Sequence, residues 1–389
     1  MLAKLLALDK EGAAGDTGAM PFPHDAPRDE AFPRDAVEAV THPDPCPFYR
    51  RLRQERPLFF DTHLGLWVAS SHAAVSAALA HPALRVRPPD EPVPPALQGR
   101  AAGEVFAQLL RMTDGAFHAD HKPDVELVSR RWTLTDVARA AEDAARDLRP
   151  RLPANAFIAA LPVQAMARLL GVPAGEREAT CRWAAQFAQG IAPGADAQAV
   201  ALADAAAAAL MDQGRALGLS AVQAANRIAF MQQALDAGSG LFGHVALQLA
   251  QDPRQAAAAD ASRDAMRALV REVERWAAPI QNTRRFAAEP LTLLGQPIAA
   301  GQALLLVLAS ANRDEAFNTQ PDRFDVHREG GGSLGFGAGP HACPGAAIAI
   351  EMVASCAAWM RAAGQFDHYF GRCTGFRPLP NARIPVFGQ

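Results

Sequence analysis

One cysteine lies in a glycine-rich run whose residue types suit it to bind a metal. Cys343 stands near the end of Phe336-Gly337-Ala338-Gly339-Pro340-His341-Ala342-Cys343-Pro344-Gly345. The small residues let backbone approach a flat ligand, and Pro344 suits the first position of a helix that the apolar run 346–350 predicts. A thiolate at a helix N-terminus meets free N–H groups and the helix dipole, so we expect a lowered pKa and metal ligation. The alternative is a buried free cysteine at a turn, a common fate of an isolated cysteine.

A carboxylate and a guanidinium lie three residues apart in a segment with helical spacing. Glu272 and Arg275 share one face of that helix, and alone they predict a surface ion pair worth about 0.2–0.5 kcal/mol. The segment Pro279-Ile280-Gln281-Asn282-Thr283-Arg284-Arg285 follows, and a charged stretch over residues 311–328 precedes the cysteine run.

Taken together, these motifs resemble the haem-thiolate signature of the cytochrome P-450 family, over roughly residues 40–389. The resemblance implies haem b (iron protoporphyrin IX) with Cys343 as its axial ligand, since a thiolate pushes electron density onto haem iron and favours O–O cleavage. It also implies that Glu272, Arg275 and Arg323 form a buried network that holds the cysteine loop, because guanidinium donates to several acceptors in a fixed fork. Around the haem it implies propionate contacts from His118, Arg285 and His341, and contacts from Phe336, Gly337 and Gly345.

The helix containing His118 departs from the family pattern one turn later. Lys122 stands where the family often has arginine, and Pro123 follows it. Proline suits the first turn of a helix and not its interior, so we expect this helix to begin later than usual. Whether Lys122 contacts a propionate stays open.

The helix that the resemblance places across the haem departs from the family pattern as well. Counting back from Glu272 puts its groove at residues 234–238, where a small residue, any residue, an acid and a threonine are usual. The acid, Asp236, is present, but Ala237 replaces the threonine whose hydroxyl steers protons. Ser239 is the nearest alcohol and would point about 200° round the helix, so we do not expect it to substitute.

Composition excludes several other classes of protein. The chain has 389 residues, is 50% hydrophobic and 20% charged, and carries a net charge of −3, so nothing favours nucleic acid or an anionic membrane as partner. Its five cysteines lack paired spacing, which indicates a reducing cytoplasm and neither disulfides nor zinc. The N-terminal apolar segment is too short for a signal peptide, and no charge-free apolar run reaches the roughly 18 residues of a membrane span.

The remaining patterns predict one mainly helical domain. We expect a flexible N-terminal arm over 1–39 and a single haem domain over 40–389. The spacing predicts a helix at 47–53, a hairpin at 57–68, a loop at 85–100 and helices over most of 104–285, including the alanine-rich 199–210. It also predicts a hairpin at 291–298 and a strand or the edge of a helix at 302–308. The fold class is therefore mainly α with small β-sheets (α+β), and the resemblance implies the cytochrome P-450 prism.

The leading functional hypothesis is a haem-thiolate monooxygenase acting on a small or medium organic molecule. It would use dioxygen and electrons from a ferredoxin or flavodoxin with its reductase, docking near Arg130 and Arg131, with Asp236 relaying protons. The alternatives are a peroxide-driven peroxygenase, a non-oxygenating enzyme (rearrangement, coupling or dehydration) for which Ala237 is no defect, and a haem-based sensor. Candidate substrate-pocket residues, the amides among them offering polar handles, are Phe230, Gln233, Ile280, Gln281, Asn282 and Phe376.

Overall fold

The computed structural model describes residues 32–364, 366 and 369–388. Its N-terminal elements are η1 (Glu38–Val40), α2 (Cys46–Glu55), β1 (Leu58–Asp61), β2 (Leu66–Ala69), α3 (His72–Ala80), β3 (Leu84–Arg85), η2 (Pro95–Leu97), α4 (Ala101–Gln108) and η3 (Leu110–Met112). The central elements are α5 (Gly115–Arg130), α6 (Leu134–Leu148), α7 (Ala154–Leu169), α8 (Arg177–Gly190), α9 (Ala197–Ala216), α10 (Ala221–Gln251), α11 (Pro253–Ala259) and α12 (Arg263–Ala277). The C-terminal elements are β4 (Thr283–Ala287), β5 (Leu291–Leu293), β6 (Gln296–Ile298), β7 (Ala303–Leu306), α13 (Leu308–Ala311), η4 (Gly339–His341), α14 (Ala346–Ala362), β8 (Cys373–Phe376) and β9 (Pro385–Phe387).

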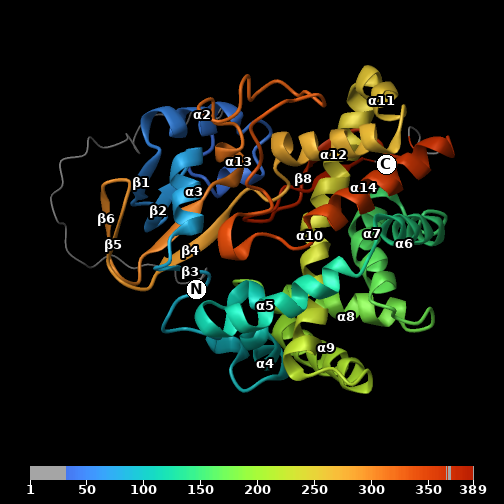
Figure 1. The fold of residues 1–389 in the computed structure, drawn as a ribbon, viewed down its shortest axis with the longest axis horizontal. Helices are drawn as coiled ribbons and strands as arrows, with labels where there is room; N and C mark the ends of the chain where they lie inside the picture. Colours follow the sequence, from blue (N-terminus) through green and yellow to red (C-terminus); the bar gives the residue numbers. More distant parts are fainter. Residues whose placement is uncertain (1–31, 365, 367–368, 389) are drawn as a thin grey trace.

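Helices and strands occupy different halves of the molecule. Figure 1 shows the strands β1 to β6 with α2 and α3 on one side, helices α6, α7 and α8 on the opposite side, α4, α5 and α9 at the lower edge, and α10 running through the middle. The largest sheet has the order β1-β2-β7-β4-β3, in which only the β2–β7 pair is parallel. The fold is thus mainly α with small sheets, as the sequence predicts.

Local signals explain where the central helices begin. Ser220 and Gln223 form a capping box at the start of α10, and Ser262 caps α12. The alanine-rich segment forms the helix α9, whose buried face consists largely of alanines. The Asp204 carboxylate of this helix lies 3.9 Å from the Arg100 guanidinium. The prediction for Pro123 is wrong, because α5 already begins at Gly115 and carries Pro123 in its interior.

Close packing fixes α10 against its neighbours. Gly238, Gly240 and Gly243 each leave no room for a methyl group, since an added Cβ would lie 2.6 Å from Pro162, 3.0 Å from Pro279 and 2.9 Å from Pro385, respectively. Glycine lets a helix approach another backbone this closely. The helix is therefore held by α7 on one side and by two proline-containing segments on the other.

Two predictions about the chain's ends can be compared with the structure in part. Of the arm expected over 1–39, residues 1–31 lie outside the described residues, whereas Ala36 and Ala39 are buried in a core cluster with Val68 and Leu305. One described stretch, Gly339–Ala362, is long and apolar enough to cross a membrane by composition alone. Half of its apolar window is buried in the protein, as for a core helix, since Met352, Val353 and Met360 of α14 belong to the main core.

Candidate functional site

The loop that carries Cys343 is a closed turn held by its own backbone. The Cys343 N–H donates to the Phe336 carbonyl at 2.8 Å, and the Gly337 N–H donates to the Leu334 carbonyl at 2.8 Å. Gly337 has φ = 70°, a left-handed conformation that favours glycine, and a Cβ there would lie 3.3 Å from the His341 carbonyl oxygen. These bonds fix where the thiol stands relative to the start of α14.

The environment of Cys343 differs from the expectation in one respect. Helix α14 begins at Ala346 with Gly345 as its N-cap, so Pro344 precedes the helix rather than opening it. Burial raises the pKa of the Cys343 thiol, a Gly345 N–H opposes this, and the Glu274 carboxylate adds to it. The predicted lowering of the pKa is therefore wrong, because desolvation outweighs the single N–H that reaches the sulfur. The side chain is nevertheless exposed, so the thiol is open to a ligand on one side and enclosed by protein on the others.

A group of polar side chains near this loop could bind carboxylates. The rings of His118 and His341 lie 4.4 Å apart between centroids, and Asp114 accepts a hydrogen bond from His341 Nε2 at 3.0 Å. Burial lowers the pKa of His118, and His341 and Lys122 lower it further. Although burial alone would raise it, hydrogen bonds from His341 and Val86 hold the pKa of Asp114 below its usual value. The sequence reasoning missed Asp114, although its position directly before α5 was a signal.

Arg285 and Lys122 occupy different positions around this group. Arg285 is buried, burial lowers its pKa, and Asp114 is the nearest charge opposing that shift. Within the described residues its guanidinium makes one hydrogen bond, to the Arg284 carbonyl, which leaves further N–H groups available. Lys122 donates to the Pro340 carbonyl and lies 3.7 Å from Glu126. Through its hydrogen bond to the Pro340 carbonyl, Lys122 connects α5 to the cysteine loop.

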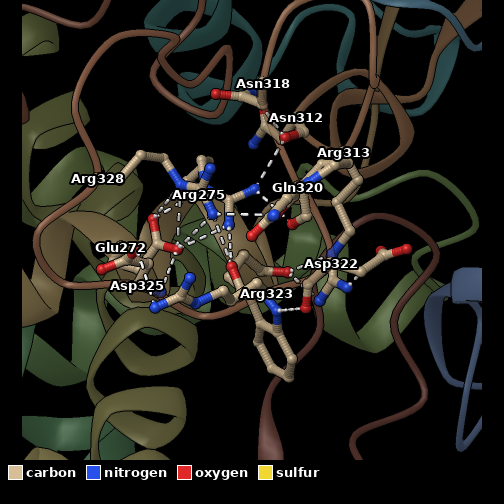
Figure 2. A network of polar contacts seen from close by, with 12 residues as sticks. Glu272, Arg275, Asn312, Arg313, Asn318, Gln320, Asp322, Arg323, Asp325 and Arg328 are labelled. Carbon is tan, nitrogen blue, oxygen red and sulfur yellow. Dashed lines mark hydrogen bonds and ion pairs between the residues drawn. The ribbon is translucent and has the colours of Figure 1, made fainter.

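Glu272 and Arg275 form a buried ion pair rather than a surface one. Arg275 donates to the two Glu272 carboxylate oxygens at 2.8 and 2.7 Å, and the two side chains are 3% and 5% exposed. Arg275 also donates to the carbonyls of Asn312, Pro321 and Arg323. This pair therefore ties α12 to the segment that leads to the cysteine loop (Figure 2).

The third side chain of the network is Arg328, not Arg323. Figure 2 shows the Arg275 and Arg328 guanidinium groups both facing Glu272, with Arg328 3.4 Å from the carboxylate. Arg323 contributes its backbone carbonyl, while its side chain is 67% exposed and lies 3.7 Å from Asp325. The turn at Gln320, whose φ is 47°, directs the following backbone carbonyls inward, so Arg328 reaches the site from the far end of the loop.

On α10 the Ser239 hydroxyl and the Asp236 carboxyl, the two groups that could take part in proton transfer, point to different sides of the helix. The Ser239 hydroxyl donates to the Ile158 carbonyl of α7 at 3.1 Å and is buried, so it faces away from Asp236. Asp236 is half exposed and lies 3.9 Å from Arg377, which the sequence reasoning missed. Burial raises the pKa of Asp236, and Arg377 opposes the shift. Ala237 is half-buried beside it.

Two of the expected pocket residues, Gln281 and Asn282, already hydrogen-bond to distant parts of the fold. Gln281 is 1% exposed, donates to the carbonyls of Ala277 and Ala278 and accepts from the Tyr49 hydroxyl. Asn282 donates to the Pro380 carbonyl at 3.0 Å. Neither amide is free to hold a substrate, because both join the segment after α12 to other parts of the chain.

The remaining pocket candidates lie in different surroundings. The Phe230 ring packs edge-on against Trp132 at 5.7 Å and lines a pocket of about 390 Å³ between α5 and α10. Phe376 lies under the Arg383 guanidinium at 3.4 Å, which makes a cation–π contact. Ile280 is half-buried and bridged to Ala382, and Gln233 is exposed. Ile280 therefore pairs with the segment before β9 and Phe376 lies in β8, whereas Phe230 lines a separate pocket.

The donor set fits a haem. A single thiol, open on one side, offers one axial ligand, and His118, His341 and Arg285 offer N–H groups suited to carboxylates such as propionates. Cys343 and this group of N–H donors come from three distant parts of the chain, α5, β4 and the cysteine loop. The arrangement can hold a flat, dianionic metal cofactor between them.

Known proteins resemble the chain in sequence and in fold. The family model described as cytochrome P450 matches residues 256–360. The chain is 38% identical to the cyclomarin C epoxidase of Salinispora arenicola over 109 residues, 28% of each chain, and 38% identical to linalool 8-monooxygenase of Pseudomonas putida over 106 residues, 27% of this chain and 26% of that protein. These matches thus span only about a quarter of the curated relatives' own length.

Solved structures match over almost the whole chain. P450BioI in complex with hexadec-9Z-enoic acid ligated acyl carrier protein aligns with a TM-score of 0.75 at 22% identity, covering 90% of this chain and 97% of that one. Epothilone B-bound cytochrome P450epoK aligns with a TM-score of 0.75 at 22% identity, covering 93% and 98%. At this identity the likeness establishes the fold.

Proposed function

From the match of residues 256–360 to the cytochrome P450 model and from the shared fold, we propose that the chain is a haem-thiolate monooxygenase of that family, which oxidises an organic molecule with dioxygen and electrons from a redox partner. The observation that carries the proposal is the closed Cys343 loop, with its one-sided thiol, beside the His118–His341–Arg285 group. Haem held by a thiolate supplies dioxygen activation when bound. We assign Cys343 as its axial ligand and His118, His341 and Arg285 as propionate contacts.

The protein's own residues divide the remaining work. Glu272, Arg275 and Arg328 hold the segment that leads into the cysteine loop, and Phe336, Gly337 and Gly345 shape the loop around the sulfur. Asp236 is placed to move protons, since it is half exposed and its pKa is raised toward neutrality by burial.

The electron donor is a small iron–sulfur or flavin protein, a ferredoxin or flavodoxin with its reductase. Its docking site includes the end of α5, where the Arg130 side chain is 76% exposed. Charged encounter surfaces steer association, so the rate of reduction should fall as salt rises. All five cysteines are free, which agrees with the cytoplasm as the compartment.

The test begins with the reduced, haem-loaded protein and carbon monoxide. We expect the red-shifted Soret band of thiolate-bound haem, and its loss in Cys343→Ala; retention of the band in that variant would refute the ligand assignment. Turnover is then measured with dioxygen, ferredoxin and reductase on a substrate panel. The panel includes acyl chains on acyl carrier protein, because a solved neighbour binds one. Product formed from peroxide alone would assign the peroxygenase class.

One observation favours a second function, non-oxygenating haem chemistry such as rearrangement, coupling or dehydration. Ala237 supplies no hydroxyl, and the Ser239 hydroxyl is occupied by the Ile158 carbonyl. An enzyme that never cleaves dioxygen needs no alcohol at this point. Product formation without oxygen or reductant would select this function over the first.

A further inference from the structure

Glu274 is a buried carboxyl group that lies between Glu272 and Arg275 but does not belong to their ion pair. It is 6% exposed, and within the described residues no ion pair involves it. Two positions along a helix turn a side chain about 200°, so Glu274 faces away from the Glu272 carboxylate. A buried carboxyl group is costly unless it is hydrogen-bonded, so its position calls for a reason.

The Glu274 carboxyl lies against the first residues of the cysteine loop. Its Oε1 is 1.8 Å from the place where a Cβ of Gly335 would stand, so residue 335 has to be glycine while the carboxyl is there. The Ser333 Oγ lies at the same place, 3.3 Å from that Cβ position, and its hydroxyl opposes the rise in the Glu274 pKa that burial causes. The same hydroxyl oxygen accepts from the Gly335 N–H at 3.0 Å and from Asn312 Nδ2 at 2.9 Å. The Ser333 oxygen thus accepts two hydrogen bonds, and its own O–H is left to donate toward Glu274.

These bonds continue without a break to Cys343. Asn312 Oδ1 accepts from the Leu334 N–H at 2.7 Å, and the Leu334 carbonyl accepts from the Gly337 N–H at 2.8 Å. The next carbonyl but one, that of Phe336, accepts from the Cys343 N–H at 2.8 Å. A shift of residues 333–335 would therefore move the thiol.

We propose that Glu274 is a positioning residue for the cysteine ligand: by accepting from Ser333 and packing on Gly335, it anchors the start of the loop to α12. The effect of Glu274 on metal ligation rests on the proposed haem-thiolate function, whereas its effect on the position of the loop does not depend on a bound haem. It differs from the role of Glu272 and Arg275, which hold residues 312–328, further from the ligand.

The first test compares Glu274→Gln with Glu274→Leu. Glutamine keeps an acceptor oxygen for Ser333 and should retain both the thiolate band of the carbon monoxide complex and the slow amide exchange of residues 334–343. Leucine removes the acceptor, so these amides should exchange about fivefold faster, the effect of one net hydrogen bond. The thiolate band should then convert in part to the blue-shifted form that has lost the thiolate. An unchanged leucine variant, or equal losses in both variants, would overturn the proposal.

A control with a similar serine contact is available on α14, where Glu351 differs from Glu274 in forming ion pairs with Arg263 and Arg267. Glu351 is 1% exposed and accepts from the Ser355 hydroxyl at 2.8 Å, so it is also a buried carboxylate bonded to a serine. Glu351→Gln should lower the unfolding midpoint while leaving loop exchange and the thiolate band unchanged. If it changed them as Glu274→Leu does, general destabilisation would explain both and the proposal would fall.

A second pair of variants tests the contact with Gly335 directly. Gly335→Ala puts a methyl group into the Glu274 carboxyl, so it should speed loop exchange and weaken the thiolate band. Adding Glu274→Ala removes the clash and should restore part of both signals, because residues in contact behave non-additively. Additive losses would overturn the contact. A wild-type protein without the thiolate band would refute the proposed function, yet its loop exchange would still report the anchor.

Discussion

Arg328 and Arg323 provide the sharpest test of how the network around Glu272 is built. Glu272 accepts from Arg275, from the Asp325 N–H at 2.8 Å and from Arg328. The Arg328 side chain is 12% exposed and also donates to the carbonyls of Arg323, Thr319 and Gln320. Alanine at position 328 would therefore remove a cation from a buried carboxylate and take away the side-chain donor of the Thr319 carbonyl, whereas the Arg323 and Gln320 carbonyls keep Arg275 and the Arg323 N–H as donors.

The two arginines should differ severalfold in their effect on stability. Each lost hydrogen bond costs about 1 kcal/mol net, and breaking a buried ion pair costs about 3–5 kcal/mol. Since Arg328 lies 3.4 Å from Glu272 and Arg275 remains, we expect Arg328→Ala to lower the free energy of unfolding by about 3 kcal/mol. Arg323 is 67% exposed with a loose pair to Asp325, so Arg323→Ala should cost less than about 1 kcal/mol.

Urea unfolding followed by far-UV circular dichroism measures both variants, with Soret absorbance reporting haem retention. If Arg328→Ala fails to fold, Arg328→Lys keeps the charge but loses the fork, and should lie between the two. Equal losses for Arg323→Ala and Arg328→Ala, or a larger loss for Arg323→Ala, would refute this account of the network.

Four further variants test residues of α10 and Arg377, which lies beside it. Burial lowers the pKa of His244 from 6.5 to about 3, so the stability contributed by the neutral ring is complete above pH 6.5 and is lost as pH falls from 6.5 toward 3. Between pH 7 and pH 4 the wild type should therefore lose about 3 kcal/mol more free energy of unfolding than His244→Gln, as measured by urea unfolding. Ala237→Thr should raise the ratio of product to peroxide far more than it changes substrate affinity, and an unchanged ratio would remove position 237 from proton delivery. Asp236→Asn should slow turnover by about 10²-fold. Arg377→Gln should shift the acidic limb of the pH–rate profile to higher pH, because Arg377 lowers the pKa of Asp236.

The sequence predicted the helices and strands better than the side-chain contacts that connect them. Helical periodicity and caps are local, so α9, α10 and α12 follow from their own residues. The choice between Arg323 and Arg328 depends on the path of an irregular loop, which no periodic pattern records. The amides of Gln281 and Asn282 look like surface handles in the sequence, but their partners lie in distant segments.

The errors at Pro123 and Cys343 have a common physical origin. Helix α5 continues through Pro123 although local propensity opposes it, so tertiary packing outweighs the preference. At Cys343 the helix dipole favours the thiolate, but burial outweighs it. Both involve an environment formed only when the whole chain has folded. The contact between Glu274 and Gly335 likewise forms only in the folded chain, so the sequence does not predict it.

The three glycine–proline contacts of α10 determine where the proposed substrate specificity could be changed. Because Gly238, Gly240 and Gly243 pack directly on Pro162, Pro279 and Pro385, α10 has no free side-chain volume there to enlarge or reduce. Directed evolution of new specificities should therefore find few tolerated substitutions at these glycines. Adaptive changes should collect instead at the more open segments, such as residues 86–100 between β3 and α4 and residues 191–196 between α8 and α9.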